Sequence, residues 1–91
     1  MNTLRNIRTE SAFLRFLGPS ILEIMERYGD NQLYMDAKIE TIIFNEQKDT
    51  YEVALHVGFE GAHNPPYHFI RMVLRIPGEE KKTGHYDVIS Y

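Results

Sequence analysis

The side chains of this chain that could do chemistry gather between Glu60 and His68, where a carboxylate, two imidazoles, an amide and a phenol surround a proline pair. Gly61 can adopt the positive φ that turns a chain sharply, and Pro65-Pro66 fixes two φ angles and lacks two N–H donors. We therefore expect a stiff loop between two strands, in which an X-Pro bond can be cis. Rigid loops on a scaffold often carry binding residues. The predicted binding residues are Glu60, His63, Asn64, Tyr67 and His68.

A second interpretation of this loop is architectural. The prolines leave backbone groups without partners, and the side chains of His63 and Asn64 can bond them. Under this interpretation the loop stabilises a corner of the sheet and recognises nothing. The residues alone leave both interpretations open.

Metal binding and catalysis are alternative uses of the same region. His56, Glu60, His63 and His68 lie close in sequence, and imidazole with carboxylate suits zinc. However, His56 and Glu60 lie about 13 Å apart along an extended strand. The spacing matches no standard metal site, and no nucleophile elbow or phosphate loop is present. We therefore assign no metal ligand, no catalytic residue and no cofactor.

Composition excludes several classes of function. A chain of 91 residues with 43% hydrophobic and 25% charged residues is typical of one globular domain. The net charge is −3 and the longest basic run is Lys81-Lys82, which argues against nucleic-acid binding. The absence of cysteine excludes disulfides and thiolate catalysis. No stretch is a transmembrane segment or a signal peptide. We expect an extracytoplasmic or cell-envelope location if a leader was removed, and a cytoplasmic one otherwise.

The first third of the chain has helical periodicity. Residues 9–29 are expected to be helical, with residues 1–8 frayed. Apolar residues recur at i, i+3, i+4 and i+7, at Ile21, Ile24, Met25 and Tyr28. Gly18-Pro19 predicts a kink or a split, because proline removes a helical N–H donor. Gly29 is a typical residue to end the helix.

From Leu33 onward the apolar residues alternate, which predicts four strands at about 34–44, 51–60, 67–76 and 85–91. Each strand has one set of residues expected to face the core. These sets are Met35, Ala37, Ile39, Thr41 and Ile43; Tyr51, Val53, Leu55, Val57 and Phe59; Ile70, Met72, Leu74 and Ile76; and either Tyr86 with Val88 or Asp87 with Ile89.

Short connections between successive strands predict an antiparallel meander. The predicted fold is therefore a single α+β domain, 1–91, with the helix packed on a four-stranded sheet, similar to cystatin-like folds. Four apolar residues have the parity opposite to the core set and are predicted to form an interface: Ile42, Phe44, Phe69 and Val73. Either the N-terminal segment or a second subunit covers them. Edge strands offer a further route to dimerisation.

Four segments of the chain resemble a small family of bacterial proteins, mostly from spore-forming Gram-positive species, classed as a domain of unknown function. They are the octapeptide Glu60–Tyr67, the segments Leu33–Ile39 and Val73–Gly78, and the helix from Pro19 to Gly29. The resemblance covers about Phe16 to the C-terminus, and the octapeptide is its specific motif. It implies a small exported or envelope-associated domain, since such proteins commonly begin with a hydrophobic leader. This chain differs in lacking that leader and in having His68 where the family pattern has glycine.

The sequence thus favours a non-enzymatic binding or protein-interaction domain that presents the proline-rich loop. Its expected partner is a second copy of the chain or another protein. A small enzyme or metal-binding protein that uses His63, His68 and Glu60 is the alternative hypothesis.

Overall fold

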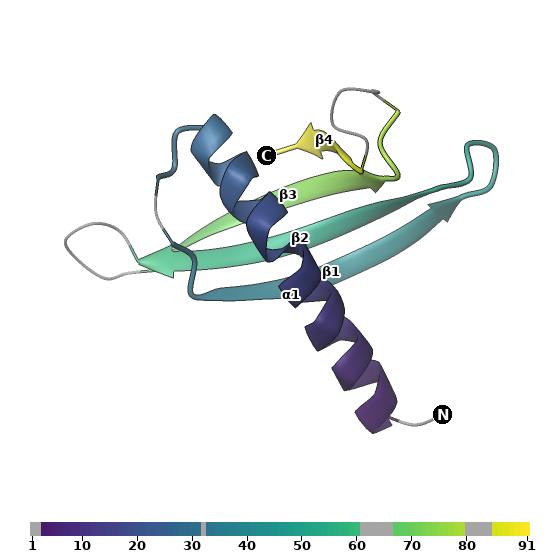
Figure 1. Ribbon diagram of the computed structural model, residues 1–91, viewed down its shortest axis with the longest axis horizontal. Coiled ribbons are helices and arrows are strands. Elements are labelled where there is room, and N and C mark those ends of the chain that lie inside the picture. Colours follow the sequence, from purple (N-terminus) through teal and green to yellow (C-terminus); the bar gives the residue numbers. More distant parts are fainter. Residues whose placement is uncertain (1–2, 32, 61–66, 80–84) are drawn as a thin grey trace. The chain divides into compact units, whose positions relative to one another are not determined.

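The computed structural model describes residues 3–31, 33–60, 67–79 and 85–91. One helix, α1 (Thr3–Arg27), precedes four strands: β1 (Asp36–Asn45), β2 (Thr50–Glu60), β3 (Tyr67–Ile76) and β4 (Asp87–Ser90) (Figure 1). The strands form one antiparallel sheet in the order β1-β2-β3-β4. The predicted α+β class, one helix followed by a four-stranded meander, is confirmed. The chain divides into two units, residues 1–33 with the helix and residues 34–91 with the sheet.

Helix α1 is continuous through Gly18 and Pro19, so the predicted split of the helix is wrong. Thr3 to Arg8, which the sequence predicts to fray, also belong to the helix. Proline at position 19 removes the N–H that would bond the carbonyl of Arg15. Because Arg15 is an exposed residue, water can bond that carbonyl, and one lost bond does not end a helix of 25 residues.

The end of α1 follows the predicted glycine. Gly29 has φ +92° and donates its N–H to the carbonyl of Glu26 at 3.1 Å. Asp30 donates its N–H to the carbonyl of Met25 at 2.8 Å. These two bonds form a Schellman motif, which satisfies carbonyls that have no partner within the helix. Of the predicted stripe, Ile21, Ile24 and Met25 are buried, whereas Tyr28 lies beyond the helix and is exposed.

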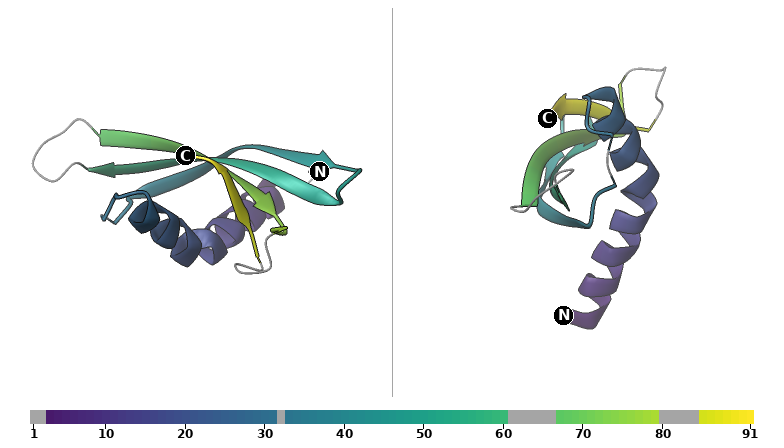
Figure 2. Two further views of the ribbon diagram at one scale, coloured as in Figure 1. Left: turned by 90° about the horizontal axis from the view of Figure 1, so that it is seen from above. Right: turned by 90° about the vertical axis from the view of Figure 1, so that its left-hand side faces the viewer.

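Strands β2 and β3 present one buried face, as predicted. Residues directly opposite each other in an antiparallel pair point to the same side of the sheet. The buried face contains Val53, Leu55, Val57, Phe59, Met72 and Leu74. Val88 of β4 pairs with Leu74, so it points to the same side, as the first of the two predicted alternatives requires. We call the opposite side of the sheet the outer face; the strands twist along their length (Figure 2).

Strand β1 departs from the predicted alternation at a β-bulge. Ile39 pairs with Leu55 of β2, but the next pair joins Thr41 to Ala54, so Glu40 is an extra residue. An extra residue reverses the side to which every later side chain points. Ile42 consequently pairs with Val53 on the buried face.

Two sequence predictions are wrong because of the bulge. Thr41 and Ile43, predicted to face the core, lie on the outer face, where Ile43 pairs with Glu52. Ile42 and Phe44, predicted to lie opposite the core set, lie on the same side as that set. Of the predicted interface, only Phe69 and Val73 belong to the outer face.

Strand β4 is held against the end of β3 by a small polar cluster. Arg75 Nη1 lies 3.5 Å from Asp87 Oδ2 and 3.6 Å from Glu79 Oε2. Asp87 Oδ2 also accepts the backbone N–H of Glu79 at 2.7 Å. Gly78 lies so close to Tyr86 and Asp87 that a Cβ there would fall within 2.9 Å of both residues. The Ile76-Pro77 bond, which directly precedes Gly78, is cis.

Candidate binding surfaces

The predicted proline-rich loop connects β2 to β3. Glu60 and Tyr67 form the last backbone pair of this hairpin. Residues 61–66, which include His63, Asn64 and the two prolines, lie outside the described residues, as do the X-Pro bonds there that the sequence allows to be cis. His68 is exposed and pairs with Phe59, and the two rings stack with centroids 5.5 Å apart.

His56 and His68 do not converge. His68 shares a side of the sheet with Phe59, whereas His56 pairs with Arg71 on the outer face. The two imidazoles therefore lie on opposite sides, and one metal ion cannot take both. Among the described residues, no group of three His, Cys, Asp or Glu side chains could hold a metal ion.

His56 instead belongs to a row of polar side chains across three strands of the outer face. The carboxylate oxygen Oε2 of Glu40 accepts a hydrogen bond from Arg71 Nε at 2.7 Å and lies 3.0 Å from His56 Nε2. The hydrogen bond from Arg71, assisted by the contact with His56, lowers the pKa of Glu40 below its ordinary value. The bulge carries Glu40 to this position. The sequence signal for it is the run Thr41-Ile42-Ile43-Phe44, which interrupts the alternation.

The second half of β1 is apolar on both sides. We call Thr41–Asn45 the edge segment, because β1 is the first strand in the sheet order. Ile42, Ile43 and Phe44 are between 45% and 58% exposed. Phe44 also contacts Tyr51 of β2, with ring centroids 4.9 Å apart.

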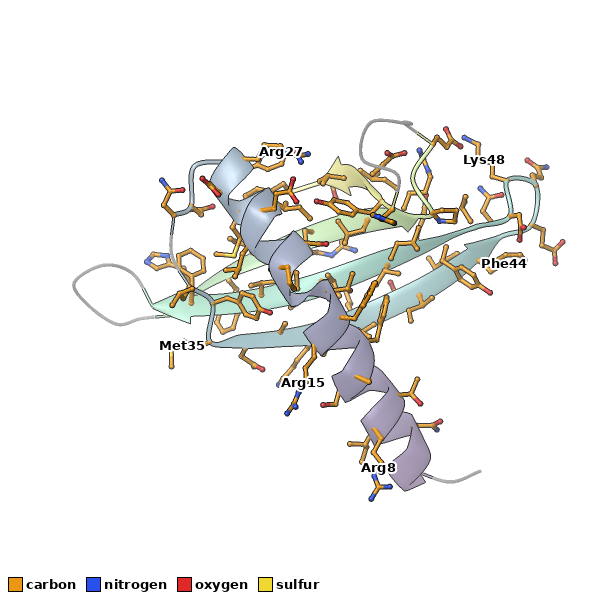
Figure 3. All side chains as sticks on the ribbon, in the orientation of Figure 1. Arg8, Arg15, Arg27, Met35, Phe44 and Lys48 are labelled. Atoms are coloured by element: carbon orange, nitrogen blue, oxygen red, sulfur yellow. The ribbon has the colours of Figure 1, made fainter. Side chains whose placement is uncertain are left out.

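A hollow lies at the other end of β1. Figure 3 labels Met35 near the start of this strand and Phe44 near its end. The hollow has a volume of about 330 Å³ and is lined by Met35, Asp36, Gly58 and Phe69, and we call it the Phe69 hollow. Met35 is 62% exposed and Phe69 is 72% exposed. Met35 donates its backbone N–H to the carbonyl of Gly58 at 2.8 Å, which fixes the start of β1 against β2.

The absence of a side chain at Gly58 positions the ring of Phe69. Gly58 pairs with Phe69 on one side and with Asp36 on the other. A Cβ at position 58 would lie 3.2 Å from Cε1 of the ring, so the ring lies directly over the glycine. Sequence reasoning identified Phe69 as a surface residue and missed the hollow. The signal that could have found it is a glycine inside an alternating strand.

Comparison with known protein families identifies this chain's family. Residues 9–91 match the family described as a protein of unknown function, DUF3888. The chain belongs to the DUF3888 family. No curated protein and no solved structure matches it. The DUF3888 region begins inside α1 and includes all four strands, so it contains both the edge segment and the Phe69 hollow.

Membership of the DUF3888 family agrees with the domain of unknown function that the sequence resembles, and it adds no activity. Within the described part of the chain, no helix is long and apolar enough to cross a membrane.

Proposed function

We propose that this DUF3888 protein is a non-enzymatic protein-interaction domain that associates with a second copy of itself through the edge segment. The observation that carries the proposal is the exposure of Ile42, Ile43 and Phe44 on an edge strand. Edge strands present N–H and C=O groups that another strand can bond. Natural edges are usually protected by charges, bulges or short length.

The two halves of β1 differ in this protection. The first half contains Asp36, Lys38 and Glu40, and the bulge at Glu40 interrupts regular pairing. The edge segment contains no charged residue and no proline. The other edge strand, β4, has only four residues. Thr41–Asn45 is therefore the part of the sheet edge best suited to strand addition.

A second copy is the partner that the composition of the edge segment favours. Two edge segments that pair antiparallel around a two-fold axis have no charged residue within the paired stretch, where each copy contributes the same apolar side chains, and Glu40 and Glu46 flank that stretch. A pairing of about five residues is a small interface, so we expect a dimer that dissociates on dilution.

Light scattering over a range of protein concentrations tests the proposal. The mass should rise from 10.7 kDa toward twice that value as the protein concentration is raised. Ile43→Lys should remain monomeric, because charge on both copies opposes pairing, while within one copy the new cation would face Glu52. Ile89→Lys on β4 is the matched control, since Ile89 is also exposed, and it should dimerise normally. A wild-type protein that stays monomeric, or equal loss in both variants, would refute the proposal.

The loop from Glu60 to His68 is proposed as a second contact surface, supported by its composition alone. His63→Ala and Asn64→Ala should leave the melting temperature unchanged if the loop serves recognition. A decrease of several degrees in both variants would support the architectural interpretation instead. Bacterial origin and export, which the sequence resemblance implies, are also proposals.

A further inference from the structure

The Phe69 hollow has the chemistry to receive a positively charged side chain. Its two large lining groups are a thioether and an aromatic ring, which provide apolar contact for a chain of methylene groups. An aromatic ring also attracts a cation placed over its face. Asp36 also lines the hollow, and because it pairs with Gly58, its carboxylate points to the same side of the sheet as the ring of Phe69.

The carboxylate of Asp36 is available for a ligand. Within the described part of the chain it makes no ion pair. Glu40, the next carboxylate along β1, differs because it already makes hydrogen-bonding contacts with Arg71 and His56. Lys38 lies between them on the same face, and its ammonium also makes no ion pair with a described residue.

The size and exposure of the hollow indicate what kind of molecule carries the cation. A volume of about 330 Å³ is at the lower end of the range for small-ligand pockets. Such pockets bury most of their ligand, whereas Met35 and Phe69 remain largely exposed here. A site of this kind suits one anchoring side chain within a wider protein contact.

We propose that the Phe69 hollow binds a lysine or arginine side chain of a partner protein. The methylene stem lies against Met35 and Phe69, and the charged end lies over the ring and beside the carboxylate of Asp36. The net charge of −3 also favours association with a basic partner. The hollow and the edge segment lie at opposite ends of β1, so this inference does not depend on self-association.

The test is an NMR titration of the whole chain with a blocked pentapeptide that has one central lysine between glycines. Saturable shifts are expected at the amides of Asp36, Gly58 and Phe69 and at the methyl group of Met35. A peptide with norleucine in place of lysine keeps the stem and loses the charge, so it should bind about tenfold more weakly. Raising the salt concentration should weaken binding of the lysine peptide and leave binding of the norleucine peptide unaffected.

Variants assign the effect to the two groups. Asp36→Asn should lower the affinity for the lysine peptide about threefold, and Phe69→Leu should lower it about three- to fivefold. Asp49→Asn is the matched control. It removes an exposed carboxylate from the β1–β2 turn, where φ is +52° and asparagine is well tolerated. Equal affinity for the lysine and norleucine peptides, shifts confined to other residues, or equal loss in Asp36→Asn and Asp49→Asn would overturn the proposal.

Discussion

Gly78→Ala probes the closest backbone approach among the described glycines. The new Cβ would lie 2.7 Å from the carbonyl carbon of Tyr86, 2.8 Å from its oxygen and 2.9 Å from Oδ1 of Asp87. Ordinary van der Waals contact begins at 3.4 Å, so the two segments must separate by several tenths of an ångström. Two of the three obstructing atoms belong to the backbone, which cannot turn away as a side chain can.

The separation disturbs the contacts that hold β4. Strand β4 has only three backbone pairs with β3, and Asp87 also accepts the N–H of Glu79 and faces Arg75. Overpacking of this kind costs typically 1–3 kcal/mol, and weakening the Glu79–Asp87 bond adds to it. We expect a loss of about 2 kcal/mol, which lowers the melting temperature of a domain of this size by about 8–16 °C.

Thermal and urea unfolding followed by circular dichroism measure the loss. Gly29→Ala is the matched control, because a Cβ there meets nothing within 4 Å and only the φ of +92° opposes it. That variant should lose about 1 kcal/mol from backbone strain alone. If Gly78→Ala is within about 0.5 kcal/mol of the wild type, the close approach of Gly78 to β4 is absent in solution and the reasoning fails.

Three further predictions concern charge and packing. The pKa of Glu40, followed by NMR, should lie below its ordinary value and return toward it in Arg71→Gln. Because the folded-state pKa is depressed, the stabilisation by Glu40 is present above its unfolded-state pKa of about 4.3 and is lost as pH falls through the folded-state pKa. The stability difference between wild type and Arg71→Gln should therefore vanish in acid, and a constant difference would contradict this. Lys48→Gln should change stability by less than about 0.5 kcal/mol, since its ion pair is half-exposed at both ends, and a larger loss in urea unfolding would show that the pair is stronger. Gly58→Ala should change the free energy of unfolding by less than about 1 kcal/mol, because the obstructing atoms of Phe69 can turn away. The same variant should shift the NMR resonances of the Phe69 ring, and unchanged ring resonances would contradict the close contact.

Local patterns in the sequence predicted much of the fold. Alternation along Tyr51–Phe59 requires a strand with one buried side, because its apolar residues would otherwise be half exposed. The residues Val53, Leu55 and Val57 are accordingly buried. Gly29 marked the end of the helix because few other residues tolerate its positive φ.

The errors arose where one local feature changes everything that follows it. A bulge at Glu40 leaves the type of each residue unchanged but reverses the side to which Ile42 and Phe44 point. The run Ile42-Ile43-Phe44 shows that the alternation breaks, but it does not locate the bulge, because the pairing with β2 determines where the extra residue is inserted. A kink or a split was expected at Gly18-Pro19, and the helix is not split, because the loss of a single N–H on an exposed stretch is tolerated.

The candidate surfaces were predicted only in part. The sequence identified Phe69 as a surface residue, but the hollow beside it depends on the pairing of Gly58 with both Asp36 and Phe69. The row from Glu40 to Arg71 joins residues 31 positions apart, and only the strand register brings them together. Side-chain types are visible in the sequence, whereas juxtaposition across strands is a property of the register.

An isotope-filtered NOE experiment on a mixture of labelled and unlabelled protein tests the role of the edge segment most directly. Self-association through this segment predicts contacts between copies at the methyl groups of Ile42 and Ile43 and the ring of Phe44, absent when Ile43→Lys replaces the wild type. Contacts between copies that involve β4 and omit these three residues would contradict the proposed pairing.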